Sequence, residues 1–158
     1  MATLTSILKN AVITLLFLTP AIGLSQNPFF EQMAKLPDVN YTYLSSATLS
    51  MADDVASLPS DVSEVVSQLK SIEMLETDDE SSYKQIRSGI ESQYNGMSLL
   101  TKIMDDEEST MIYGAKKGTG ASQYSKILYI KDDGDSQEIK MILFTGDIEP
   151  DTIKKLVD

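Results

Sequence analysis

The sequence predicts an α+β fold, with an antiparallel meander sheet of about five or six strands and helices packed on one face. Between residues 97 and 144, four strand-like runs are separated by short polar or glycine-containing breaks, which is typical of consecutive hairpins. Within this stretch Asp132-Asp133-Gly134-Asp135 is a strong hairpin signal, because Asp-Gly tolerates the positive φ of tight turns. Outside it, apolar residues often recur three and four apart, which indicates helices.

The first 25 residues indicate a cleavable secretory signal peptide. Lys9 supplies the positive start, residues 11–18 form an apolar core too short to anchor in a bilayer, and Thr19-Pro20 ends that core. Gly23 and Ser25 permit cleavage before Gln26, while Ala21 and Gly23 would permit it before Leu24. We favour the first site, so the prediction is a signal peptide over 1–25 and a single α+β domain over 26–158.

This organisation predicts a periplasmic or secreted protein. No Cys follows the apolar core, so a lipoprotein anchor is excluded, and no second long apolar run would span a membrane after cleavage.

The first part of the domain is expected to alternate helices and strands. Residues 29–36 predict a short amphipathic helix, and residues 39–44 alternate with β-branched and aromatic side chains, which predicts a strand. Residues 47–56 predict a second helix, and a third begins at Asp61 with that residue or Ser60 as its cap. The apolar face of this third helix would consist of Val65, Val66 and Leu69.

The next two elements are a strand and the longest helix. Residues 70–77 fit either a continued helix or a strand, and the alternation of apolar and acidic residues favours the strand. Residues 81–94 predict a helix, which Asn95-Gly96 ends. Its apolar positions are Tyr83, Ile86, Ile90 and Tyr94.

The meander and a closing helix complete the chain. The four strand-like runs are 97–106, 108–116, 124–131 and 137–144. Gly146-Asp147 is expected to end the last strand, and residues 150–157 predict a helix with Pro150 near its first turn.

Composition excludes several classes of function. The chain has no Cys and no His, so it lacks a thiolate nucleophile, a disulfide, a Cys or His zinc site and a histidine general base. Its 24 acidic and 13 basic residues give a net charge of −11, which repels nucleic acid and anionic membrane surfaces. The acidity is typical of a solvated exported surface.

Two Ser-x-x-Lys matches are candidates for a serine nucleophile beside a lysine base, Ser67 with Lys70 and Ser81 with Lys84. The Lys-Thr-Gly strand that accompanies this motif in penicillin-binding enzymes is missing, and chance accounts for both matches.

Acidic turns and a glycine-containing loop are candidates for ligand binding. Three acidic clusters could offer oxygens to Ca²⁺, but none has EF-hand spacing, so we interpret them as solvated turns. They are Asp78-Asp79-Glu80, Asp105-Asp106-Glu107-Glu108, and Asp132, Asp133 and Asp135. The segment 114–120 has glycines and two lysines, as a phosphate loop does, but it lacks the Walker spacing and predicts a hairpin loop.

The order of elements resembles a known exported family. The pattern includes Ile72-x-Met74-Leu75, the four-run meander, the ending Leu143-Phe144-Thr145-Gly146-Asp147-Ile148, and a helix through Ile153 and Leu156. It is similar to domain of unknown function 4252, a family typical of Bacteroidetes envelopes. The resemblance implies export and an α+β fold, and it implies no activity. Genes of family members are often encoded beside genes for sigma and anti-sigma regulators, which suggests a role in envelope signalling.

The sequence therefore favours a non-catalytic exported envelope protein that binds another protein or a small ligand at an exposed sheet face or edge. We assign no catalytic, cofactor-binding or metal-binding residue and expect no cofactor. The alternative is a carboxylate-dependent hydrolase acting on envelope glycan, which needs only two suitably placed Asp or Glu residues. The absence of Trp counts against a sugar cleft.

Overall fold

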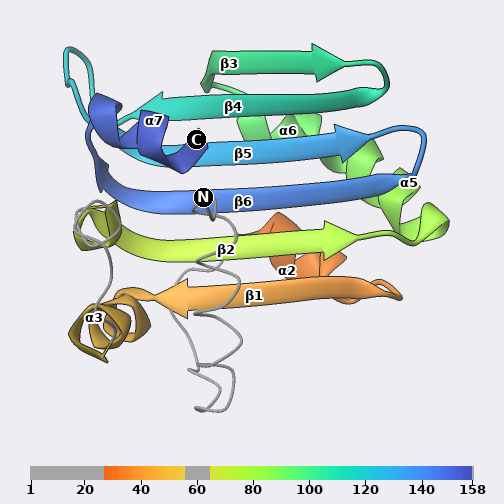
Figure 1. The fold of residues 1–158 in the computed structure, drawn as a ribbon, viewed down its shortest axis with the longest axis horizontal. Coiled ribbons are helices and arrows are strands. Elements are labelled where there is room, and N and C mark those ends of the chain that lie inside the picture. Colours follow the sequence, from red (N-terminus) through yellow and green to blue (C-terminus); the bar gives the residue numbers. More distant parts are fainter. Residues whose placement is uncertain (1–26, 56–64, 158) are drawn as a thin grey trace.

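A computed structural model describes residues 27–55 and 65–157 of the protein. Six antiparallel strands form one sheet in the order β1-β2-β6-β5-β4-β3, which runs from bottom to top in Figure 1. The strands are β1 (Val39–Ser45), β2 (Leu69–Thr77), β3 (Ser98–Asp105), β4 (Glu108–Lys116), β5 (Tyr124–Asp133) and β6 (Glu138–Ile148). The labelled helices are α2 (Pro28–Met33), α3 (Ser46–Val55), α5 (Glu80–Gly89), α6 (Glu91–Tyr94) and α7 (Pro150–Val157).

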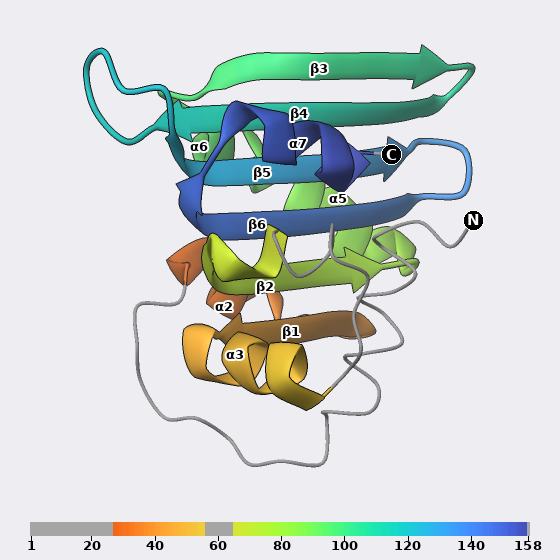
Figure 2. The ribbon, with the colours of Figure 1, turned by 60° about the vertical axis from the view of Figure 1, so that its left-hand side comes forward.

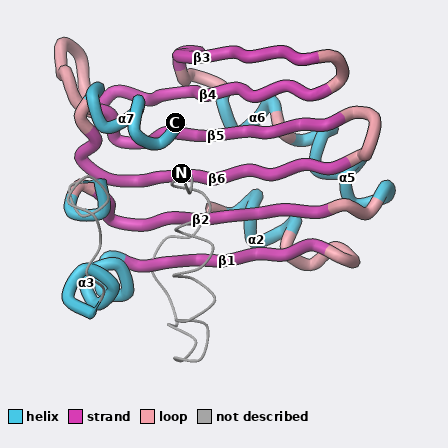
Figure 3. Tube along the Cα trace, in the orientation of Figure 1, coloured by secondary structure: helices cyan, strands magenta, loops and turns pink. Residues whose placement is uncertain are grey.

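The α+β class and the antiparallel meander are confirmed. Strands β3, β4, β5 and β6 follow one another in sequence and in space, joined by the loops visible in Figure 3. Strand β2 pairs with the far side of β6, from Leu69 opposite Gly146 to Thr77 opposite Ile139, and β1 pairs with β2. The chain thus places β1 and β3 at the two edges of the sheet.

The prediction that helices pack on one face is wrong, because they cover both faces (Figures 1 and 2). The α5 face carries α2, α5 and α6, and the α7 face carries α3, the helical residues 65–67 and α7. The cause lies in the central strands. In Met141-Ile142-Leu143-Phe144 every residue is apolar, so alternate side chains enter opposite cores.

The two cores share the sheet as their common wall. On the α5 face, Phe30 and Ile86 pack against Leu75, Ile130 and Met141. On the α7 face the core contains Leu49, Val65, Val66, Leu69, Ile72, Ile112, Ile127, Ile142, Phe144, Ile148 and Ile153. Burial of both sheet faces supplies the main stabilisation of this disulfide-free chain.

Side-chain caps begin two of the helices. Asn27 caps α2 by accepting the Phe29 N–H at 2.9 Å, and Pro28 occupies the first turn, where its missing N–H costs no hydrogen bond. Asp79 caps α5 by accepting the Ser82 N–H at 2.8 Å. The acidic residue Asp79 therefore has a structural role.

Several boundaries differ from the predictions. Strand β6 does not end at Gly146-Asp147 but continues to Ile148, since Tyr124 of β5 pairs with that last residue. The predicted helix 81–94 is two pieces, α5 and α6, although Ile90 between them keeps helical dihedral angles. Residues 1–26 and 56–64 lie outside the described residues, and with them the predicted signal peptide and the start of the helix at Asp61.

Candidate functional site

Exposed apolar side chains gather on the edge strand β3. Leu99 is 50% exposed, Ile103 52% and Met104 66%, and these are three of the four exposed large apolar side chains among the described residues. Strand β3 pairs with β4 alone, so the backbone N–H and C=O groups along its other side have no strand partner in the described sheet. An apolar strand edge of this kind is a template for pairing with another chain.

The pairing of β3 with β4 determines the direction of each exposed side chain. Leu99 and Met104 lie opposite Tyr113 and Ser109 and face the α5 side, whereas Ile103 lies opposite Thr110 and faces the α7 side. A register shift between Leu99 and Thr101 interrupts the alternation. The β3 edge therefore presents apolar side chains on both sides of its unpaired backbone.

An acidic turn, Asp105–Glu108, lies at the end of β3, and Asp105, Asp106 and Glu107 are exposed. Nearby Asp135 raises the pKa of the Glu107 carboxyl, because one proton shared between two carboxyl groups relieves their repulsion. Glu108 pairs with Lys131 at 2.9 Å, and this contact raises the pKa of Lys131. The turn is the negative end of the β3 edge.

A basic loop lies at the opposite end of the same edge, where β4 ends in Lys116 and continues into Lys117. In Figures 1 and 2 the loop from β4 to β5 extends past the end of the sheet at which β3 begins. Lys117 contacts Asp147 at 2.7 Å and Lys70 contacts the same carboxylate at 3.1 Å, so the pKa of Asp147 is lowered. Lys116 is exposed.

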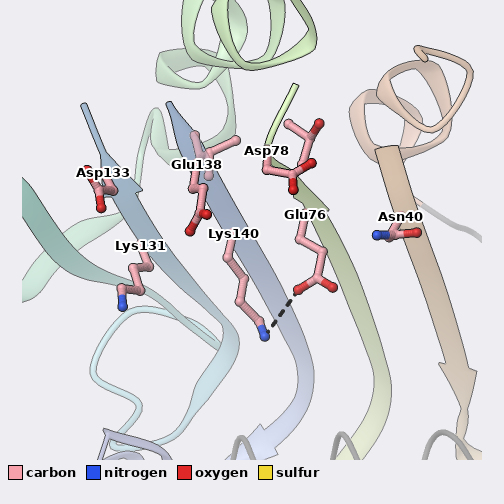
Figure 4. Close-up of a pocket in the computed structure, with 9 residues that line it drawn as sticks. Asn40, Glu76, Asp78, Lys131, Asp133, Glu138 and Lys140 are labelled. Carbon is pink, nitrogen blue, oxygen red and sulfur yellow. Dashed lines mark ion pairs between the residues drawn. The ribbon is translucent and has the colours of Figure 1, made fainter. Parts of the chain in front are cut away.

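A charged hollow of about 400 Å³ lies on the α7 face, at the strand ends away from α3 and α7 (Figure 4). Its floor is a cross-strand row in which Asn40, Glu76, Lys140 and Lys131 lie opposite one another on β1, β2, β6 and β5. Glu76 and Lys140 form an ion pair at 3.3 Å, drawn dashed in Figure 4. The hollow is also lined by Thr77, Asp78, Asp133, Glu138 and Ile139.

A second carboxylate network is buried on the α5 face. Glu73 is 3% exposed, and it accepts the Asn27 backbone N–H on both carboxylate oxygens, at 2.9 and 3.1 Å, and the Tyr41 O–H at 3.0 Å. Burial raises the pKa of Glu73, against the opposing effect of these hydrogen bonds. Burial and Glu73 also raise the pKa of the Tyr41 phenol. The bonds of Glu73 hold α2 to the sheet and leave no open approach for a substrate.

The carboxyl group of Asp132 joins α5 to the sheet. It is 8% exposed, accepts the Tyr83 O–H at 2.8 Å and lies 3.4 Å from the Arg87 Nε. Arg87 Nη1 in turn donates to the Tyr83 oxygen at 2.6 Å. Burial raises the pKa of the Tyr83 phenol, and its hydrogen bond to Asp132 raises it further. This cluster is a structural clamp between α5 and β5.

The Ser-x-x-Lys matches do not form nucleophile and base pairs. Ser67 ends a helical turn whereas Lys70 belongs to β2 and pairs with Asp147, so the two residues are not on one helix. Ser81 and Lys84 do share α5, but the ammonium of Lys84 contacts Glu80.

The acidic clusters are turns and caps. Asp133 accepts the N–H groups of Asp135 and Ser136 at 3.0 and 3.1 Å, which lowers the pKa of its carboxyl, while Asp132 faces the other side of the sheet. Across residues 27–55 and 65–157, no group of three or more acidic side chains is placed to hold a metal ion.

The glycine-containing segment 114–120 belongs to β4 and the hairpin loop after it. Gly114 lies where an added Cβ would be 2.7 Å from the side chains of Leu100 and Tyr124, so tight packing explains this glycine. The Lys117 N–H donates to the Gln123 carbonyl at 3.0 Å and the Ala121 N–H to the Gly118 carbonyl at 3.1 Å. These amides bond within the loop.

The sequence patterns did not predict the exposure of β3 or the burial of Glu73. A strand with apolar residues on both faces at the edge of the sheet could be recognised only from strand order. Glu73 and the more exposed Glu76 are both acidic residues beside apolar residues of the same strand, so the local sequence did not show which of the two is buried.

No helix among the described residues is long and apolar enough to cross a lipid bilayer.

Comparison with known proteins gave one positive result, a match to a family model. No curated protein and no solved structure matches the chain significantly. The family model described as "Domain of unknown function (DUF4252)" matches residues 30–156, which includes every strand of the sheet and all but the outermost residues of the helices on its two faces. The chain therefore belongs to the DUF4252 family.

Proposed function

We propose that this protein is a non-catalytic exported protein of the cell envelope that binds another protein by adding an extended segment to the β3 edge. The signal-like sequence of residues 1–25 supports export to the periplasm or beyond the cell. Envelope signalling is the process that the family resemblance suggests for such a binding protein.

The exposed edge of β3 is the observation that carries the proposal. Natural proteins protect sheet edges with prolines, covering helices, bulges or inward charges. Strand β3 has no Pro. Despite its register shift between Leu99 and Thr101 and its two charged residues, Lys102 and Asp105, it exposes Leu99, Ile103 and Met104. Main-chain hydrogen bonds to an added strand would supply affinity, and these side chains would supply selectivity.

The opposite edge provides a comparison within the same molecule. The apolar side chains of β1 are used inside the protein, since Leu44 packs on the core of the α7 face and Val39 and Tyr41 pack on that of the α5 face. Every β1 residue except Asn40 is at least partly buried. The β1 edge thus lacks exposed apolar anchors and serves as a control surface.

The carboxylates support the hydrolase alternative less well. The hollow brings Glu76, Asp78, Asp133 and Glu138 to one place, which is the observation in its favour. A glycosidase acid needs a raised pKa and access to substrate. Asp133 has a lowered pKa, Glu76 is paired with Lys140, and the buried carboxyl with a raised pKa, Glu73, lies on the other face.

Site-specific photo-cross-linking in intact cells tests the proposal. The photoreactive residue p-benzoylphenylalanine is placed at Ile103 on β3, with Asn40 on β1 as the matched exposed control. We expect a discrete protein adduct at position 103 that is absent at position 40 and is lost when Leu99→Asp is added. Equal adducts at both positions, or an adduct that survives Leu99→Asp, would overturn the proposal.

A further inference from the structure

We infer that the strand added to the β3 edge is the β3 strand of a second copy, paired antiparallel about a two-fold axis. This inference rests on the proposed function and names the partner of the same edge. The product would be a dimer with one continuous sheet, and the exposed apolar side chains of both copies would be covered at once.

The sequence of β3 is complementary to itself in one antiparallel register. Centred on Ile103, this register places Ile103 opposite its own copy on the α7 side, so that two exposed apolar side chains meet. Thr101 then lies opposite Asp105, a hydroxyl donor facing a carboxylate acceptor. Lys102 lies opposite Met104, where the lysine stem covers the thioether. In each opposed pair the two side chains lie on the same face of the sheet, as an antiparallel ladder requires.

Charge complementarity between the two ends of the edge favours a second copy. An antiparallel partner reverses its direction, so its acidic turn Asp105–Glu108 comes to the corner where β3 begins. Figures 1 and 2 show the basic β4–β5 loop rising at that same corner. Lys116, exposed at its base, then faces Asp106 and Glu107 of the other copy, and the symmetry repeats this contact at the other corner.

Single-cysteine variants test the pairing cleanly because the chain has no Cys of its own. Opposed residues of an antiparallel pair have Cα atoms about 4.5–5.5 Å apart, within the roughly 4.4–6.8 Å that a disulfide bridges. We expect Ile103→Cys in the purified full chain to oxidise to a covalent dimer. Asn40→Cys on the exposed part of β1 is the matched control and should stay monomeric on a non-reducing gel.

A charge swap tests the register independently of any disulfide. Lys116→Glu should weaken self-association about tenfold in sedimentation velocity, because it places like charges at two symmetric corners. Adding Glu107→Lys should restore most of the lost affinity. A matched change outside both corners, Lys35→Glu on the residue shortly after α2, should leave self-association unchanged.

A monomer at every concentration, with equal oxidation of Ile103→Cys and Asn40→Cys, would overturn the second-copy inference. The proposed function would survive that result if p-benzoylphenylalanine at position 103 still gave an adduct with a different protein. Absence of any adduct at position 103 would overturn both. A swap that fails to restore association, while Ile103→Cys still forms its specific covalent dimer, would overturn the proposed register.

Discussion

Glu73 accepts the backbone N–H of Asn27 with both of its carboxylate oxygens, at 2.9 and 3.1 Å. Asn27 is also the cap of α2, so one buried acid on β2 holds the point at which the first described helix begins. The contact spans 46 positions of the chain and joins α2 to β2, the strand next to the β1 edge. Sheet and helix are thus connected by a buried polar contact on the α5 face.

Removal of this acid should destabilise the fold. Glu73→Ala leaves the Asn27 N–H and the Tyr41 O–H without their acceptor, which should cost about 1–3 kcal/mol of unfolding free energy. Glu76→Ala is the matched control, because its ion pair with Lys140 is partly exposed and should cost at most about 1 kcal/mol. Urea unfolding monitored by circular dichroism measures both. Equal losses would contradict the role given to Glu73.

The raised pKa of Glu73 predicts a pH dependence of stability. A carboxyl whose pKa is raised by folding binds its proton more tightly in the folded state, so its stabilising contribution is complete below the unfolded pKa. That contribution is lost as the pH rises through the folded pKa. The difference in unfolding free energy between wild type and Glu73→Gln should therefore decrease from about pH 4 upwards. A difference that increases with pH would show that the sign is wrong.

The Tyr83 hydroxyl should contribute to the clamp between α5 and β5. Tyr83→Phe removes the donor to the buried Asp132, with an expected cost of about 1–2 kcal/mol. Tyr94→Phe is the control, because Tyr94 stacks on Tyr113 at a ring distance of 4.3 Å and phenylalanine keeps that stack. Thermal unfolding compares the two variants. A larger loss for Tyr94→Phe would argue against the clamp.

Any side chain at position 146 in place of Gly146 should destabilise the fold. A Cβ there would lie 2.1 Å from the carbonyl oxygen of Gln68, at the shifted end of the β2–β6 pairing. Because backbone blocks the space, Gly146→Ala should cost about 3 kcal/mol. Gly118→Ala meets nothing within 4 Å and should change stability by less than about 0.5 kcal/mol. Chemical unfolding of both variants decides the point, and an unaffected Gly146→Ala would contradict this packing.

Export predicts a defined processed mass. The protein recovered from the periplasm or medium of secreting cells should begin at Gln26, so its intact mass should lack residues 1–25. Cleavage before Leu24 would give a mass two residues larger and would still support export. A protein that keeps residues 1–25 and is found only in the cytoplasm would contradict the proposed localisation.

The order of the last four strands, β3 to β6, could be predicted from local patterns. The Asp132–Asp135 turn and the short breaks between runs specify hairpins, and hairpins specify the neighbours in β3 to β6. The uninterrupted apolar run 141–144 also carried the signal for burial on both faces, which the one-face prediction overlooked.

The candidate site could not be predicted in the same way. Leu99 and Ile103 look like core residues in the sequence, and they are exposed because no strand follows β3 in the described sheet and its sides carry little cover. That fact depends on tertiary arrangement. The burial of Glu73 has the same origin, since it requires α2 to lie over β2.

Hydrogen exchange of the β3 amides is the measurement that tests strand addition most directly. Exchange is first recorded on the chain alone at high dilution. It is then recorded with a saturating amount of the protein that cross-links at position 103, which is a high concentration of the chain itself if the partner is a second copy. Strand addition should slow exchange about tenfold or more across Ser98–Asp105 and leave the β1 amides Val39–Ser45 unchanged. Unchanged exchange in β3 on binding, or equal protection of both edges, would contradict it.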